Sequence, residues 1–229
     1  MADDLDRGVR LADPDRWLAS RFIADRRARA DVIALYAYDH ELARASRVTA
    51  NPLVAQMRLT WWREVLDEIF AGRPARRHPV AERLAETIRR HDLPRGFLDA
   101  MIHARIWGLD SSRLGSGEAL LWADAVGGSA TMLAARVLDP GASEAAALAA
   151  GRVWGLVLLK RAGAADGPAF RSRLEQSLGE ASRATRGLSA AAFPAVVCAT
   201  LAWGDMRATP PSQASKQLAL LWAVARGRL

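Results

Sequence analysis

The chain has 229 residues, 51% of them hydrophobic, and it contains a single cysteine, Cys198. This composition excludes an intrinsically disordered chain and any internal disulfide, and it predicts a domain with a sizeable core. The formal charge of +7 favours anionic partners, but the arginines are spread along helical polar faces. The sequence therefore lacks the dense basic tail typical of nucleic-acid binding, and we expect no nucleic-acid partner.

Apolar residues recur at spacings of three and four, the period of an α-helix, as at Leu59, Trp62 and Leu66. Residues 1–13 are acidic at the start and carry no apolar run, so we expect a flexible segment that is not a secretory signal. Breaks rich in Pro, Gly and Ser delimit ten predicted helices, with Ser143 and Ser212 as candidate caps. They cover residues 14–25, 27–48, 52–71, 78–91, 95–110, 117–138, 143–162, 168–187, 190–206 and 213–227.

The short connections between these segments predict one all-α domain over residues 1–229, a bundle of about nine or ten helices. The most apolar runs, 145–159 and 190–203, are interrupted by Arg152 and Pro194 and are short for a bilayer, so we expect no transmembrane segment. A soluble, cytoplasmic protein with a buried thiol at Cys198 is expected. Six tryptophans on apolar stripes are predicted to lie in the core: Trp17, Trp107, Trp122, Trp154, Trp203 and Trp222.

Four short motifs follow one another in a fixed order. They are Leu35-Tyr36-Ala37-Tyr38, Met57-Arg58 with Trp61-Trp62-Arg63, Gly72-Arg73-Pro74 with His78-Pro79-Val80, and Asp92-Leu93-Pro94. Each motif is weak alone, but the series resembles the squalene/phytoene synthase superfamily over residues 15–165. The resemblance implies an isoprenoid-synthase-like fold and a central cavity.

Active members of that family join two prenyl diphosphates, and the resemblance implies that Mg²⁺ ions neutralise the departing diphosphate. Mg²⁺ needs several hard oxygen ligands, which acidic residues four apart on two facing helices supply. On the first helix the two aspartates of the family motif align with Ala43 and Arg47. On the second helix the family positions fall on Leu158, Ala162, Ala165 and Asp166, so only Asp166 is acidic. We therefore predict no catalytic residue, no metal ligand and no cofactor.

The alternative hypothesis is that the chain is an active prenyltransferase whose Mg²⁺ ligands are carboxylates at other positions. Glu64, Asp67 and Glu68 are close together on one helix, but they oppose its apolar stripe, which favours a solvated face. This alternative requires three or more carboxylates that converge in one cavity.

One branch of the superfamily has already lost the acidic motifs: it includes the mitochondrial assembly factor of respiratory complex I. The chain is similar to that branch in Glu41-Leu42-Ala43 and over residues 78–93. The resemblance implies a binding or assembly factor, with a protein partner or an isoprenoid or lipid ligand. It also implies a location peripheral to the inner membrane, in contact with anionic lipid.

The candidate anion-binding residues follow from the same alignment. Tyr36, His40, Ala43 and Arg47 are spaced so that they share one helical face, which lines the cavity if the cavity persists. The other possibility is a filled core edge with Arg47 at the surface. Arg21 lies where synthases approach the diphosphate, although a surface salt bridge would explain it equally. Trp62 and Arg63 complete the candidate set, and one of Trp61 and Trp62 is expected in the core.

Overall fold

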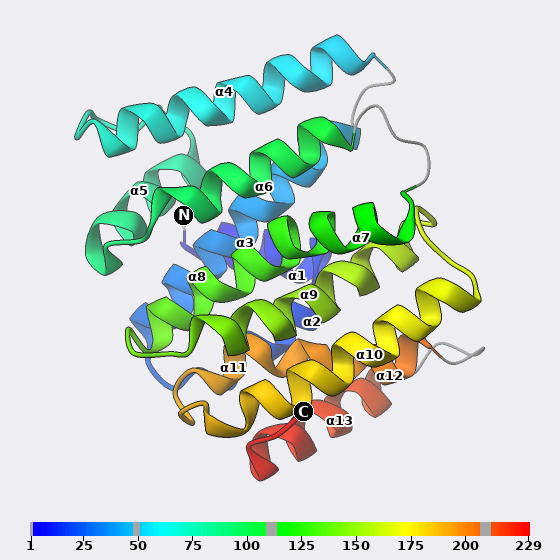
Figure 1. Ribbon diagram of the computed structural model, residues 1–229. Coiled ribbons are helices and arrows are strands. Elements are labelled where there is room, and N and C mark those ends of the chain that lie inside the picture. Colours follow the sequence, from blue (N-terminus) through cyan, green and yellow to red (C-terminus); the bar gives the residue numbers. More distant parts are fainter. Residues whose placement is uncertain (1, 48–50, 109–113, 207–211) are drawn as a thin grey trace.

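The computed structural model describes residues 2–47, 51–108, 114–206 and 212–229, and these form helices and connecting turns with no β-strand among them (Figure 1). Every one of the ten predicted segments holds helix, so the all-α prediction is confirmed. The helices are α1 (Ala2–Ala12), α2 (Pro14–Ser20), α3 (Arg26–Arg47), α4 (Pro52–Phe70), α5 (Pro79–His91), α6 (Arg95–Trp107), α7 (Ser116–Ala123), a π-helical turn η1 (Asp124–Gly128), α8 (Ser129–Leu138), α9 (Glu144–Arg161), α10 (Pro168–Ala184), a 3-10 turn η2 (Thr185–Gly187), α11 (Phe193–Val196), a 3-10 turn η3 (Val197–Leu201), α12 (Ala202–Asp205) and α13 (Gln213–Arg226).

The helix starts follow from local chemistry. Proline stands in the first turn of α2, α4, α5 and α10, where its missing N–H costs no hydrogen bond. The side chain of Asn51 accepts a hydrogen bond from the backbone N–H of Leu53 at 3.0 Å. The predicted caps are confirmed, because Ser143 and Ser212 accept hydrogen bonds from backbone N–H groups in the first turns of α9 and α13.

The core is built around two central helices. One cluster of buried apolar side chains surrounds α3 and includes residues of α4, α5, α6 and α8. The second surrounds α9 and includes residues of α7, α10 and η3. In Figure 1, α4 and α13 lie at opposite ends of the molecule, each on the outside of the bundle.

At one point η1 crosses α9 with no side chains between the two backbones. A Cβ atom added to Gly127 would lie 2.2 Å from the carbonyl oxygen of Gly151, and one added to Gly155 would lie 2.6 Å from the Cα atom of Ala123. Only glycine allows backbones to approach this closely. Gly127 therefore permits the close contact between η1 and α9.

Two expectations from the sequence need correction. Residues 2–12, expected to be flexible, form α1, which packs against α3 and buries Val9, because the apolar residues of this segment share one face of the helix. Three of the tryptophans expected in the core, Trp107, Trp203 and Trp222, are exposed, since their helices are covered on one side only. Trp122, Trp154 and the Cys198 thiol are buried as predicted.

The residues that the structure describes contain no helix both long enough and apolar enough to cross a membrane.

Candidate functional site

A central cavity of about 370 Å³ lies between α2, α3, α6, α7 and the end of α9. This volume is at the lower end of the range for small-molecule pockets. Its walls are apolar on the side of α9 and polar on the side of α2 and α3. The lining residues are Ala12, Asp13, Arg16, Tyr36, Asp39, His40, Ala43, Ser46, Arg47, Arg105, Gly108, Leu114, Trp122, Leu158, Leu159, Ala162 and Ala164.

The face predicted on α3 lines this cavity. Tyr36, His40, Ala43 and Arg47 all contribute to its wall, as the helical spacing requires. Tyr36 and Ala43 are buried, whereas Arg47 is exposed at the rim and its Nε donates a hydrogen bond to the Ala43 carbonyl at 3.2 Å. The structure thus brings these four predicted residues together, and whether they hold an anion stays a prediction.

Four of the residues predicted to align with the family's metal-binding motifs line this cavity. Ala43 and Arg47 line it from α3, and Leu158 and Ala162 line it from the end of α9. Asp166 points outward, with its side chain 78% exposed and 3.7 Å from Lys160. Among the residues that the structure describes, no three His, Cys, Asp or Glu side chains come together as a metal would require. The donor set therefore does not fit Mg²⁺.

The inner wall of the cavity holds a buried ion triad. Asp39 accepts hydrogen bonds from Nη1 of Arg16 at 2.7 Å and from Nη2 of Arg105 at 2.8 Å. Burial raises the pKa of Asp39, but the two guanidinium groups outweigh burial and hold this pKa below its usual value. Both oxygens of this carboxylate are thus engaged by arginine, which leaves Asp39 unsuited to bind a cation.

Aromatic rings support both arginines of the triad. The guanidinium carbon of Arg16 lies 5.1 Å from the centre of the Tyr36 ring and 5.9 Å from that of Trp154. The guanidinium carbon of Arg105 lies 5.0 Å from the Trp122 ring. One nitrogen on each arginine, Nη2 of Arg16 and Nε of Arg105, is buried without a hydrogen-bond partner.

Two other titratable groups face the cavity. The carboxylate of Asp13 caps α2 by accepting a hydrogen bond from the backbone N–H of Arg16 at 3.0 Å, and burial raises its pKa. Burial also lowers the pKa of His40, which leaves its imidazole neutral at pH 7. Three arginines therefore face two aspartates, so the cavity carries an excess of positive charge.

The remaining predicted residues lie outside this cavity. Arg21 pairs with Asp6 at 2.6 Å and stacks on Trp17, which agrees with the salt-bridge alternative. Trp62 is buried as predicted and lines a separate groove of about 380 Å³ on the other side of α3, together with Trp61. Arg63 lines neither space, and its buried Nε has no hydrogen-bond partner.

The acidic residues considered as displaced metal ligands form ion pairs. Arg76 bridges Glu64 at 2.8 Å and Glu68 at 2.9 Å, and Arg95 pairs with Asp67. None of these groups lines the central cavity. Asp110, another candidate for that role, falls outside the described residues.

Sequence reasoning missed Arg16 and Arg105 as cavity residues. They lie 23 and 66 positions from Asp39, and no periodicity connects such distant residues. The one available signal was Asp39 itself, an acid within an apolar stretch of helix, which a buried site tolerates only when the charge is paired.

The fold and the cavity define an all-α synthase-like protein, and the chain belongs to the squalene/phytoene synthase family. The family description "Squalene/phytoene synthase" matches residues 9–197, which includes and extends the region of resemblance.

Relatives and a solved structure agree with this assignment. NADH dehydrogenase (ubiquinone) complex I, assembly factor 6, is 29% identical in Bos taurus and 28% identical in Homo sapiens, in each case over 102 residues. These alignments cover 44% of this chain and 30% of the relatives, so the matched region spans less than a third of their length. A crystal structure of a dehydrosqualene synthase in complex with ligand superposes with a TM-score of 0.77, covering 98% of this chain and 95% of that one at 12% identity.

Proposed function

We propose that this protein is a non-catalytic member of the squalene/phytoene synthase family that acts as a binding or assembly factor. The observation that carries the proposal is the lining of the central cavity. Ala43 and Arg47 on α3 and Ala162 on α9 line this cavity, and these are positions that align with aspartates of the family motifs.

The electrostatics of these positions opposes diphosphate chemistry. When a diphosphate leaves an allylic carbon, negative charge develops on its oxygens, and in this family Mg²⁺ held by carboxylates neutralises it. Arg47 at the rim would repel a divalent cation, and Asp39 is already shared by Arg16 and Arg105. No step of a prenyl transfer is therefore assigned to these residues.

The nature of the partner rests on the relatives. Because both are named as assembly factors of complex I, we propose a protein partner in the assembly of that complex and a location in the cytoplasm, peripheral to the inner membrane. The positive excess in the cavity makes an isoprenoid or other lipid with an anionic head group its second candidate ligand. The proposed protein partner and location rest on relatives that this chain matches over part of their length only.

A turnover assay tests the non-catalytic part. Purified protein with Mg²⁺ and farnesyl or geranylgeranyl diphosphate is expected to release no pyrophosphate and no condensed product above the rate without protein. Titration with Mg²⁺ alone is expected to give no saturable heat in calorimetry. Steady product formation would overturn the proposal and establish the alternative, an active prenyltransferase with displaced metal ligands.

A genetic experiment tests the assembly part separately. Deletion of the gene in its own host is expected to lower the amount of assembled complex I, measured by native gel electrophoresis and NADH oxidation. The Arg47→Asp variant, which reverses the charge at the rim, supplies a matched complementation test. Unchanged complex I in the deletion strain would contradict an assembly role while leaving the lack of turnover intact.

A further inference from the structure

The positive charge of the chain is concentrated in its last part. Residues 181–229 contain six basic residues and one acidic residue, Asp205, a balance of +5 out of the total of +7. Asp205 is neutralised by Arg161, whose Nη2 lies 2.9 Å from the carboxylate. The rest of the chain, residues 1–180, is therefore nearly balanced at +2.

Helix α13 in this part exposes an apolar face. Its inner side buries Leu220 and Ala223, while Leu218 is 68% exposed, Leu221 53% and Trp222 61%. The three exposed side chains are three and four positions apart or adjacent, so they share one outward stripe along the helix. This stripe explains why the core position expected for Trp222 is wrong: α13 is apolar on both sides, and the bundle covers only one.

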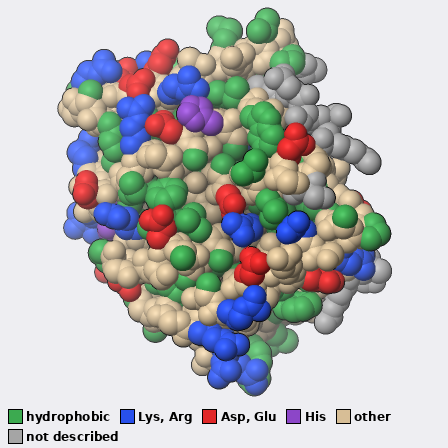
Figure 2. All heavy atoms as spheres, viewed as in Figure 1, with side chains coloured by type: hydrophobic (Ala, Val, Ile, Leu, Met, Phe, Trp, Pro, Cys, Tyr) green, Lys and Arg blue, Asp and Glu red, His purple; other side chains and the backbone are tan. Residues whose placement is uncertain are grey.

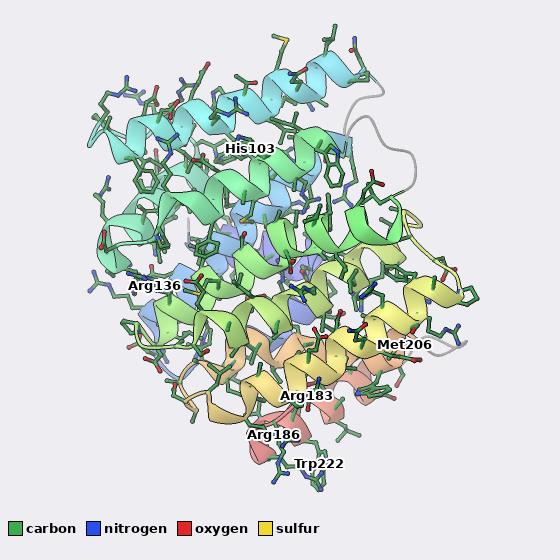
Figure 3. All side chains as sticks on the ribbon, in the orientation of Figure 1. His103, Arg136, Arg183, Arg186, Met206 and Trp222 are labelled. Carbon is green, nitrogen blue, oxygen red and sulfur yellow. The ribbon has the colours of Figure 1, made fainter. Side chains whose placement is uncertain are left out.

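Four arginines lie at the same end of the molecule as this stripe. Arg226 stacks on Trp222 with its guanidinium carbon 4.1 Å from the ring centre, and Arg228 follows it. Arg183 and Arg186 lie at the end of α10 and in η2, next to the end of the chain, where Ser182 donates a hydrogen bond to the Leu229 carbonyl at 3.4 Å. Figure 3 labels Arg183, Arg186 and Trp222 at this end of the molecule, and Figure 2 shows basic and apolar side chains gathered there.

The charge of these arginines is not neutralised within the described part of the fold. All four are exposed, and within the described residues none of them forms an ion pair. Their charge is therefore available to an external partner, since no acidic side chain offsets it. The helix itself is held to the bundle by Lys216, whose Nζ lies 3.0 Å from the fully buried carboxylate of Asp15.

We propose that Leu218, Leu221 and Trp222, together with Arg183, Arg186, Arg226 and Arg228, form a C-terminal face that docks α13 on the surface of an anionic lipid bilayer. A helix with Trp and Leu on one face and arginines beside them lies in the interface plane, with its apolar side chains below the head groups. The arginines bind the anionic head groups. This inference deepens the peripheral location proposed above and does not depend on the absence of turnover.

The chemistry of the face favours a bilayer over nucleic acid. Nucleic acid would be bound by the arginines alone and would leave the stripe of Leu218, Leu221 and Trp222 without a role. A bilayer uses both components, because the apolar side chains and the guanidinium groups each contribute to the affinity.

Vesicle co-sedimentation tests the proposal with the full chain. Vesicles of equal parts phosphatidylcholine and phosphatidylglycerol are expected to bind the protein, and vesicles of phosphatidylcholine alone to bind it at least tenfold more weakly. The double variant Arg183→Gln with Arg186→Gln is expected to lower the affinity for anionic vesicles by roughly 30-fold. Trp222→Ala is expected to lower it by tenfold or more.

A matched control carries the same charge change elsewhere. Arg58→Gln with Arg73→Gln removes two exposed arginines from α4 and the turn after it, at the other end of the molecule, and is expected to leave vesicle binding unchanged. Quenching by brominated lipid is expected to fall in Trp222→Phe, because the indole that enters the bilayer is then absent. Circular dichroism and thermal unfolding verify that each variant is folded.

Several outcomes would overturn the proposal. Binding to neutral and anionic vesicles with equal affinity, or equal loss in the α4 control, would exclude an anionic-lipid surface on α13. A concentration-dependent dimer that Trp222→Ala abolishes would identify the face as a contact between two copies. Steeply salt-dependent binding to an oligonucleotide without vesicle binding would assign the arginines to nucleic acid.

Discussion

The central cavity and the C-terminal face both contain several arginines. At the inner wall of the cavity their charge is paired with a carboxylate, whereas on the face it is exposed to solvent. In the cavity, Arg16 and Arg105 are buried, share Asp39 and rest on aromatic rings. On the C-terminal face, Arg183 and Arg186 are exposed and form no ion pair with any acidic residue that the structure describes. A count of basic residues cannot distinguish these two cases, whereas the position of the paired acid does. The first arrangement stabilises the fold, and the second leaves charge for a partner.

Removal of the shared carboxylate is expected to have the largest effect. Asp39→Ala leaves Arg105 buried with unpaired charge and leaves Arg16 with only Asp13, 3.6 Å away, so the free energy of unfolding in urea should fall by about 3–5 kcal/mol. The control Asp67→Ala removes an exposed partner of Arg95 and should cost less than about 1 kcal/mol. Similar losses for the two variants would contradict the structural role of the triad.

The stability of the folded protein is expected to fall in two stages as the pH is lowered. Since burial lowers the pKa of His40, the unfolded chain takes up a proton that the folded chain excludes, and stability should fall as the pH drops below about 6.5. The pKa of Asp39 is also lowered, so its contribution is complete above about pH 3.9 and is lost as the pH falls through the folded value.

Unfolding in urea across the range from neutral to acid pH measures both stages. His40→Gln should remove the first stage and keep the second. His103→Gln, on the exposed side of α6, should leave the first stage in place. Persistence of the first stage in His40→Gln would show that another group causes it.

The smallest effect on stability is expected at the C-terminal face. Arg183→Gln with Arg186→Gln should change the free energy of unfolding by no more than about 0.5 kcal/mol, because no ion pair is broken. The same double variant should lose affinity for anionic vesicles, so its effect on binding is expected without a matching effect on the free energy of unfolding. A loss comparable to that of Asp39→Ala would mean that these arginines hold the fold, and the contrast between the two regions would disappear.

Helical periodicity was sufficient to predict the all-α class and a shared face on α3, whereas the synthase-like fold and its cavity were implied by the family resemblance. The spacing of Tyr36, His40, Ala43 and Arg47 places them on one face of α3 whatever the rest of the chain does. Periodicity says nothing of contacts between helices, and so the partners of Asp39 on α2 and α6 could not be predicted. For the same reason the sequence could not reveal Asp6 as the partner of Arg21.

The tryptophans show a second limit. On α13 the inward Leu220 and the outward Trp222 belong to equally apolar stripes, and nothing in the local pattern tells which stripe the bundle covers. The prediction placed Trp222 inside because apolar residues are usually buried. Coverage depends on where neighbouring helices end, which is a property of the whole fold.

The bare backbone junction between η1 and α9 has a mechanical consequence. Where Gly127 meets Gly151 and Gly155, there is no layer of side chains that could shift rotamers and let the two segments slide. The end of α9, with Leu158 and Ala162, is thus clamped at a constant distance from α7.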